Sequence, residues 1–222
     1  MKTVIFDLDG TLADTSADLI AAANAAFRMG GLDVALDAQA DALTAFHGGR
    51  AMLRLGFSRL AGGWDEGDID RLYPMLLEYY GNNINHHTRL YDGVVEMLDA
   101  LAAAGMALGI CTNKPEALAE TLVRELGIRD YFGALLGADS IAVKKPDPEH
   151  LLETVRRLGG DARNTVLVGD TVTDREAGRA AGVPVVLVTF GPAGHGVARL
   201  APEALLDDYR DLPQVLERLG VG

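Results

Sequence analysis

The chain of 222 residues has little of what secreted or nucleic-acid-binding proteins depend on. Its single cysteine, Cys111, excludes an intramolecular disulfide framework and fits a reducing compartment. Basic residues are scarce, with 20 Lys and Arg against 32 Asp and Glu, and a net charge of −12 argues against binding of nucleic acid or anionic membrane. Because this charge also repels an anionic substrate, any phosphate site must carry local positive charge of its own.

Long apolar segments are missing as well. The longest clean apolar run lies near residues 183–190 and is far too short to cross a bilayer. A carboxylate, Asp7, arrives so early that it leaves no room for the apolar segment of a signal peptide. With 49% hydrophobic and 23% charged residues, the composition is that of an ordinary globular protein. We therefore expect a cytoplasmic protein, a monomer or a homodimer, that binds neither nucleic acid nor membrane.

Short β-branched runs alternate with segments of helical period over most of the chain. The runs lie at Thr3–Phe6, Ala107–Cys111, Thr165–Val168 and Val185–Phe190, with a weaker candidate at Ala134–Gly137. Their nearly continuous apolarity predicts strands that are buried on both faces of a parallel sheet. The alternation predicts an α/β fold with a doubly wound, Rossmann-like parallel sheet and right-handed crossovers.

Three helices are expected between these strands. The first has Asp92 as its N-cap and ends before Gly105, and the second has Pro115 at its first helical position. The third starts at Asp147-Pro148 and ends before Gly159.

Residues 15–85 break the alternation, because several helical patterns follow one another there with no strand between them. The strongest is an apolar stripe at helical spacing that follows Asp65. An all-helical block inserted after the first strand predicts a separate domain. We therefore divide the chain into an α/β core of residues 1–14 and 86–222 and a helical cap domain of residues 15–85.

Two carboxylates follow the first predicted strand directly. Asp7 and Asp9 are two residues apart, so they point to the same side if the extended conformation continues through them. The carboxyl end of a strand is where open α/β sheets bind ligands. Two close anions repel each other, so this arrangement needs a cation or a shared proton. Taken alone, the pair also fits a strand-to-loop transition with solvated aspartates.

Other predicted strand ends and turns supply complementary chemical groups. In chain order these are Thr112, Asn113, Lys114, Lys144, Lys145, Asp170 and Asp174. Together with Asp7 and Asp9 they offer carboxylates for a metal, a hydroxyl for an oxyanion and a fixed cation. Either of the two adjacent lysines, Lys144 and Lys145, could face such a site on this evidence.

The string Phe6-Asp7-Leu8-Asp9-Gly10-Thr11-Leu12 resembles the first motif of the haloacid dehalogenase-type phosphatase superfamily. Thr112 matches the second motif, Lys145 the third and the segment Gly169–Asp174 the fourth, in the order that the family has them. The family places its lysine directly before a proline, which selects Lys145 over Lys144. The helical block resembles the C1-type caps of the same superfamily.

This resemblance implies a magnesium-dependent phosphate-monoester hydrolase that works through a covalent aspartyl-phosphate. It implies that Asp7 is the nucleophile and that Asp9 is the general acid and base. It places Mg²⁺ on the Asp7 carboxylate, the Asp9 backbone carbonyl and Asp170. Asp174 is then expected to support Lys145 or a metal-bound water rather than to bind the metal itself.

The remaining candidates are implied to bind the substrate. Thr112 and the Asn113 N–H are placed on phosphate oxygens, and Lys145 offsets the anionic charge. In the helical block, Gly49 permits close backbone approach, and Arg50 offers its planar fork to a substrate carboxylate. An ordinary turn between helices with a surface arginine explains this last pair equally well.

Further stretches resemble bacterial phosphoglycolate phosphatases, among them Thr88–Val94, Gly109–Pro115 and Val168–Asp174. This closer resemblance implies hydrolysis of 2-phosphoglycolate, a small phosphorylated metabolite whose carboxylate Arg50 would meet. The alternatives are a phosphatase for another small phosphorylated metabolite, a β-phosphoglucomutase-like phosphomutase, a dehalogenase and a non-catalytic interaction protein. Asp9 argues against the dehalogenase, which needs no general acid at that position.

Overall fold

The computed structural model describes residues 1–221, and the chain divides into two compact units. The first unit combines Met1–Asp14 with the chain from Leu90 onward, and the second is Thr15–Arg89. The chain thus returns to the first unit at Leu90, whereas the sequence pattern placed this return at residue 86. Among the described residues, none of the helices has the length and apolarity that a membrane span requires.

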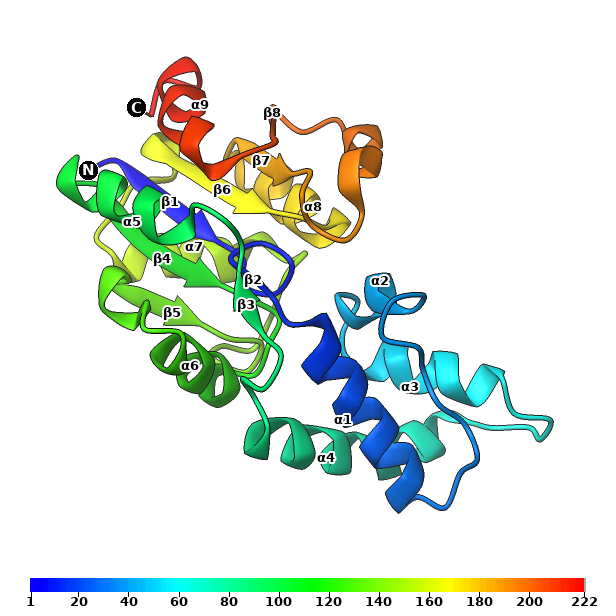
Figure 1. Cartoon of the computed structure of the whole chain (residues 1–222). Helices are drawn as coiled ribbons and strands as arrows, with labels where there is room; N and C mark the ends of the chain where they lie inside the picture. The colour runs from blue at the N-terminus through cyan, green and yellow to red at the C-terminus, as the bar shows by residue number, and fades with distance from the viewer. Residues whose placement is uncertain (222) are drawn as a thin grey trace. The chain divides into compact units, whose positions relative to one another are not determined.

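A six-stranded parallel sheet forms the centre of the first unit, with the order β5-β4-β1-β6-β7-β8 (Figure 1). Its strands are β1 Thr3–Phe6, β4 Ala107–Cys111, β5 Ala134–Leu136, β6 Thr165–Gly169, β7 Val185–Val188 and β8 Ala204–Leu206. Every residue of β1, β6 and β7 is buried, which explains why these strands are nearly continuous apolar runs in the sequence. The predicted strands are confirmed, and β8 is an additional edge strand that the sequence pattern missed.

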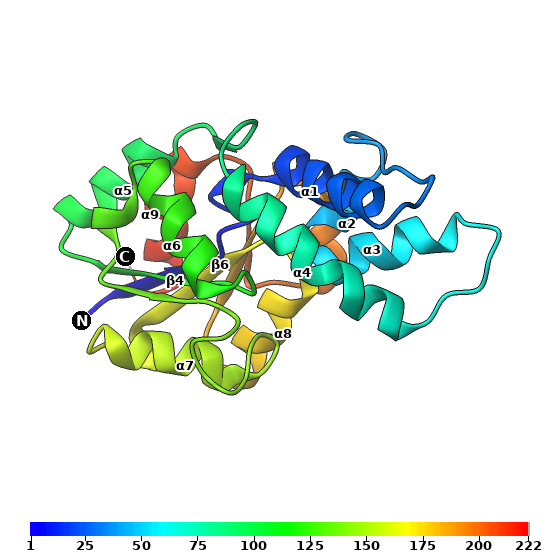
Figure 2. The same ribbon diagram turned by 90° about the horizontal axis from the view of Figure 1, so that it is seen from below.

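Helices cover both faces of this sheet, as a doubly wound fold requires. They are α5 Val94–Ala103, α6 Glu116–Glu125, α7 Pro148–Arg157, α8 Val172–Ala181 and α9 Leu212–Arg218. Figure 2 shows α5, α6 and α9 on one side of the sheet and α7 and α8 on the other. The fold class predicted from the alternation of strands and helices is therefore confirmed.

The helix starts correct two details of the sequence prediction. The N-cap of α5 is Gly93 rather than Asp92, because the backbone there takes a φ of 81° that favours glycine. Pro115 is the N-cap of α6, which begins one position later, at Glu116. α7 starts where the sequence predicted, and the Asp147 side chain caps it by accepting from the Glu149 N–H.

The second unit is built from helices. They are α1 Ser16–Met29, α2 Ala42–Ala45, α3 Gly49–Ser58 and α4 Glu66–Asn82, and α1 packs against the other three. Phe27 and Phe57 meet edge to face in its core with ring centroids 6.2 Å apart. Gly56 makes room for this pair, since a Cβ there would lie 2.7 Å from Phe27 Cε2. Two short strands, β2 Ala13–Asp14 and β3 Arg89–Leu90, pair where the chain passes between the units.

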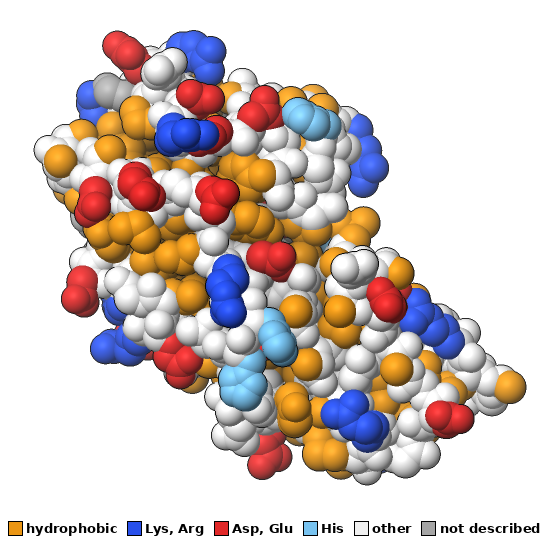
Figure 3. Space-filling model, in the orientation of Figure 1, with side chains coloured by type: hydrophobic (Ala, Val, Ile, Leu, Met, Phe, Trp, Pro, Cys, Tyr) orange, Lys and Arg blue, Asp and Glu red, His pale blue; other side chains and the backbone are white. Residues whose placement is uncertain are grey.

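Acidic and basic side chains are interspersed on the face drawn in Figure 3, with hydrophobic side chains between them. Several of the arginines pair with neighbours on their own helix, as Arg156 and Arg157 do with Glu153 in α7. Such exposed pairs stabilise a fold by at most about 1 kcal/mol each. The stability of the first unit therefore rests mainly on its buried apolar sheet.

Candidate active site

Asp7 is the first residue beyond the end of β1. Its N–H donates to the Val168 carbonyl at 2.9 Å, so the ladder between β1 and β6 continues past the strand. The Leu8 N–H donates to Asp7 Oδ1 at 2.7 Å and orients the carboxylate. The side chain is buried, and β1 lies between β4 and β6. Asp7 therefore lies in the middle of the sheet edge at which open α/β folds bind ligands.

Lys145 is the buried cation beside this carboxylate. Its Nζ lies 3.0 Å from Asp7 Oδ2 and 2.6 Å from Asp174 Oδ1. Burial by itself lowers the pKa of Lys145, but the charges of Asp174 and Asp7 outweigh it and hold the pKa above its ordinary value. The Asn113 side-chain amide donates to the Lys145 carbonyl at 2.9 Å and ties this loop to the end of β4. Lys144 is exposed, so Lys145 is the lysine of this pair that enters the site.

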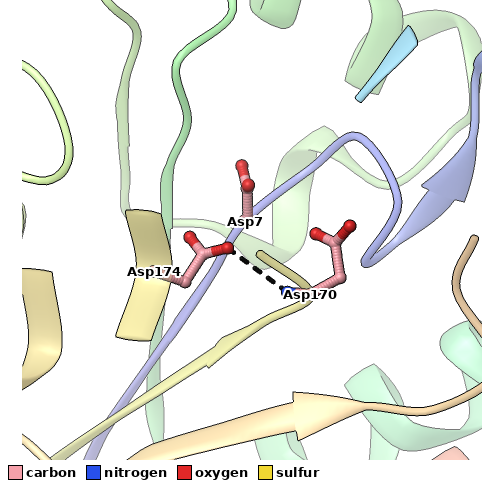
Figure 4. Close-up of side chains that lie close together, drawn as sticks. All are labelled: Asp7, Asp170 and Asp174. Atoms are coloured by element: carbon pink, nitrogen blue, oxygen red, sulfur yellow. Dashed lines mark hydrogen bonds between the residues drawn. The ribbon is translucent and has the colours of Figure 1, made fainter. Parts of the chain in front are cut away.

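Asp174 lies in the first turn of α8, where the capping box of that helix holds it. Its Oδ2 accepts from the Thr171 N–H at 3.0 Å and from the Thr171 hydroxyl at 2.6 Å. It also accepts from the Asp170 N–H at 3.3 Å (Figure 4). Gly169 permits this approach, since a Cβ there would lie 2.7 Å from Asp174 Oδ2. The other oxygen, Oδ1, accepts from Lys145.

Asp170 follows β6 and is also buried. Its Oδ1 accepts from the Thr11 hydroxyl at 2.9 Å, which joins the loop after β1 to the loop after β6. The Thr11 carbonyl accepts in turn from the buried Tyr209 hydroxyl at 2.7 Å. Figure 4 shows Asp7, Asp170 and Asp174 gathered together, and one oxygen of each lies within 4.8 Å of the others.

The three buried carboxylates share this space with one buried ammonium. Burial raises the pKa of Asp7 to about 6, although Lys145 opposes the change. Burial likewise raises the pKa of Asp170 well above its ordinary value, with repulsion from Asp174 and Asp7 adding to the effect. With all three carboxylates ionised, Lys145 would leave two negative charges uncompensated. The donor set therefore fits a divalent cation that prefers oxygen ligands.

Asp7 and Asp170, whose carboxylates the sequence suggested as metal ligands, both belong to the acidic cluster, and Asp174 is its third member. The carboxylate of Asp9 is bound by a second lysine, Lys114. Lys114 Nζ donates to Asp9 Oδ1 at 2.8 Å and to Oδ2 at 3.0 Å. The sequence placed Lys114 at a strand end but assigned it no role. The charge balance of the motif residues could have indicated a role for Lys114. Four aspartates and a single lysine leave an excess of negative charge, which a second lysine reduces.

Thr112 and Asn113 follow β4, which pairs in parallel register with β1, so Thr112 and Asp7 leave the sheet at the same edge. The Thr112 N–H donates to the Leu136 carbonyl at 3.0 Å, and its hydroxyl accepts from the Lys114 N–H at 3.2 Å. Asn113 Oδ1 is buried and lacks a hydrogen-bond partner among the described residues. The end of β4 thus carries an acceptor that no donor in the described part of the chain satisfies.

Gly49 and Arg50 lie in the second unit, at the start of α3 rather than in a turn. Gly49 packs against α4, since a Cβ there would lie 3.0 Å from Tyr73 Cε2. The Arg50 guanidinium lies over the Tyr73 ring, 4.8 Å from its centroid, and its Nη2 is 2.7 Å from Asp70 Oδ1. With 43% of its side chain exposed, Arg50 is accessible to solvent in this arrangement.

Comparison with known proteins identifies the protein family to which the chain belongs. Residues 4–188 match the family model of the haloacid dehalogenase-like hydrolases. The matched segment contains each motif residue of the site, from Asp7 to Asp174. The chain belongs to the haloacid dehalogenase-like hydrolase family, which confirms the resemblance seen in its motifs.

The relatives are phosphatases with different substrates. The chain is 39% identical to the phosphoglycolate phosphatase of Agrobacterium fabrum, over 97% of this chain and 92% of the relative. It is 34% identical to the N-acetylmuramic acid 6-phosphate phosphatase of Pseudomonas aeruginosa, over 98% of this chain and 96% of the relative. A solved structure of a predicted phosphoglycolate phosphatase from Haemophilus somnus 129pt superimposes with a TM-score of 0.83 at 26% identity, covering 97% of both chains.

Proposed function

We propose that this chain is a magnesium-dependent phosphate-monoester hydrolase that forms a covalent aspartyl-phosphate on Asp7. The observation that carries the proposal is the meeting of Asp7, Lys145, Asp170 and Asp174 at one edge of the sheet. Membership of a hydrolase family, with relatives named as phosphatases, supports the same reaction.

Asp7 is the nucleophile of the first step. One of its carboxylate oxygens forms a bond to phosphorus while the bond from phosphorus to the alcohol oxygen breaks in line with it. Asp9 gives a proton to that leaving oxygen. The Thr112 hydroxyl and the Asn113 N–H hold phosphate oxygens, and Lys145 offsets their charge.

Water completes the reaction. Asp9, now ionised, takes a proton from a water molecule whose oxygen attacks phosphorus. The bond between phosphorus and the Asp7 oxygen breaks, inorganic phosphate leaves, and both aspartates regain their starting states. One water is consumed for each alcohol released.

Asp7, Asp170 and the Asp9 backbone carbonyl are the proposed ligands of Mg²⁺. When bound, the ion neutralises negative charge on the ligands and on a phosphate oxygen. Two raised carboxyl pKa values in one buried cluster support a cation at this place. Asp174 has a supporting part, because its two oxygens accept from Lys145 and from the start of α8.

The proposed substrate is 2-phosphoglycolate. The name of the relative from Agrobacterium fabrum supports it, as does the accessible guanidinium of Arg50, which suits a carboxylate. We assign the helical unit, Thr15–Arg89, the part of a cap that supplies Arg50 and Gly49 to the substrate. N-acetylmuramic acid 6-phosphate, from the name of the Pseudomonas relative, is the second candidate.

The test is phosphate release from a panel of phosphorylated metabolites in the presence of Mg²⁺. The panel includes both named candidates and several sugar phosphates. We expect the highest kcat/KM with 2-phosphoglycolate and no isomer from any sugar phosphate. Comparable turnover of many sugar phosphates would overturn the assignment of 2-phosphoglycolate as the substrate. Isomer formation without phosphate release would show that the chain is a mutase.

A further inference from the structure

Lys114 is a buried cation to which the proposed reaction assigns no part. Only 3% of its side chain is exposed, and its Nζ donates to both carboxylate oxygens of Asp9. Lys145 serves different partners, Asp7 and Asp174. Lys114 thus binds Asp9, and Lys145 binds Asp7 and Asp174, whereas Asp170 accepts from the Thr11 hydroxyl.

The backbone of Lys114 is fixed on both sides. Its N–H donates to the Thr112 hydroxyl at 3.2 Å, and its carbonyl accepts from the Ala138 N–H at 2.9 Å. Gly137 packs so closely that a Cβ there would lie 2.7 Å from the Lys114 carbonyl oxygen. The ammonium therefore extends from a part of the loop that has little freedom to move.

The segment against Lys114 is itself anchored to two helices. The Gly137 carbonyl lies 3.0 Å from Nε2 of the buried His150 in α7. Asp139 Oδ1 accepts from the Glu116 N–H at 2.7 Å, at the start of α6. The contacts that hold the backbone of Lys114 therefore come from the loop around Gly137 and from the helices α6 and α7, and not from Asp7 or the acidic cluster.

Asp9 needs such an anchor for the part that the proposed function gives it. It lies in the loop after β1, and 17% of its side chain is exposed. A proton-transfer group works efficiently only when it is held in position. Two hydrogen bonds from one ammonium fix the plane of the carboxylate, whose two oxygens have about four acceptor sites in all. The carboxylate can therefore be held by Lys114 and still exchange a proton with the leaving oxygen or with water.

We propose that Lys114 is the positioning residue for Asp9, which it holds in the orientation needed for proton transfer. The inference rests on the proposed function, because it assumes that Asp9 protonates the leaving alcohol. Lys114 acts through Asp9 and is given no contact with the substrate.

Two substrates with different leaving groups distinguish a positioning role of Lys114 from a general structural effect of its loss. An alkyl phosphate such as 2-phosphoglycolate needs a proton on its leaving oxygen, whereas p-nitrophenyl phosphate releases a stable anion. In Lys114→Met we expect kcat/KM for the alkyl phosphate to fall about ten- to a hundredfold, which is a part of the roughly 10²–10⁴-fold that general acid catalysis contributes. For p-nitrophenyl phosphate we expect a change of no more than about threefold. Lys144→Met, which removes an exposed lysine, is the matched control and should leave both values unchanged.

A double-mutant cycle adds a second criterion. If Lys114 acts through Asp9, then Asp9→Asn combined with Lys114→Met should have the same kcat/KM as Asp9→Asn alone. Lys114→Arg keeps the charge and should retain more of the preference for the alkyl phosphate than Lys114→Met does. If the methionine variant fails to fold, Lys114→Arg replaces it in the comparison of the two substrates.

The outcomes are distinguishable. A parent chain that releases no phosphate from any alkyl phosphate would overturn the proposed function and this inference together. Phosphate release by the parent, with both substrates equally slowed in Lys114→Met or with additive losses in the cycle, would overturn the inference alone.

Discussion

Magnesium affinity is expected to fall as the pH is lowered from 7 to 5, because the ion needs ionised carboxylates. Burial raises the pKa of Asp7 to about 6. With that value, Asp7 is about 90% ionised at pH 7 and about 10% ionised at pH 5. Asp7 alone should therefore weaken the apparent affinity about tenfold over this interval. The raised pKa of Asp170 adds to the dependence in the same direction.

Asp7 also determines how stability without the metal depends on pH. Its folded pKa of about 6 lies above the ordinary value of 3.8, so the folded state binds the proton more tightly than the unfolded state. This contribution to stability is complete below pH 3.8 and is lost as the pH rises through about 6. A shift of about 2 units corresponds to about 3 kcal/mol. Without Mg²⁺ at pH 7, Asp7→Asn is therefore expected to unfold with a higher Tm than the parent.

Titration calorimetry with Mg²⁺ at pH 5, 6 and 7 measures the first effect, and thermal unfolding without added metal measures the second. Asp7→Asn is the matched variant, since it lacks the titrating carboxyl and should show weaker binding with a shallower pH dependence. An apparent Kd that is the same at pH 5 and pH 7 in the parent would refute the reasoning. So would an Asp7→Asn variant that is less stable than the parent at pH 7 without metal.

Three further substitutions test separate parts of the account. Lys145→Met removes the buried cation between Asp7 and Asp174 and should lower kcat for phosphate release at least about a hundredfold; near-normal turnover would remove Lys145 from the mechanism. Gly169→Ala forces a Cβ against Asp174 and should lower the free energy of unfolding by about 1–3 kcal/mol. An unchanged midpoint in urea would show that Asp174 has room to move. Arg50→Ala should raise KM for 2-phosphoglycolate about tenfold, from the loss of one charged hydrogen bond, without raising KM for p-nitrophenyl phosphate. Equal increases would show that Arg50 does not read the carboxylate.

Much of the α/β core was predictable because its strands are buried on both faces. The runs Thr3–Phe6 and Ala107–Cys111 coincide with β1 and β4, since strands that are buried on both faces are mostly apolar and carry no charged residues here. β8 was missed because it is an edge strand whose residues Ala204 and Leu205 are not buried, so no continuous apolar run marks it. The left-handed backbone at Gly93 depends on a local turn that periodicity does not report.

The gathering of the candidate site was predictable from the parallel sheet. Groups that follow separate strands in the sequence must come to one edge, and Asp7, Asp170 and Asp174 do lie together there. The partners of each carboxylate were not predictable, because they depend on side-chain directions. Lys114 follows β4 and Lys145 lies in the turn before α7, and only the structure assigns Asp9 to the first lysine and Asp7 to the second.

Trapping the covalent intermediate tests the central claim most directly. Asp9→Asn should still transfer the phosphoryl group from p-nitrophenyl phosphate to Asp7, but it should be slow to activate the water that removes it. Mass spectrometry of the variant, denatured during turnover and digested, should then find one added phosphoryl group on the peptide from the N-terminal region, with fragmentation assigning it to Asp7. A phosphoryl group on another residue, or phosphate release that persists at the parent rate in Asp7→Asn, would contradict the account.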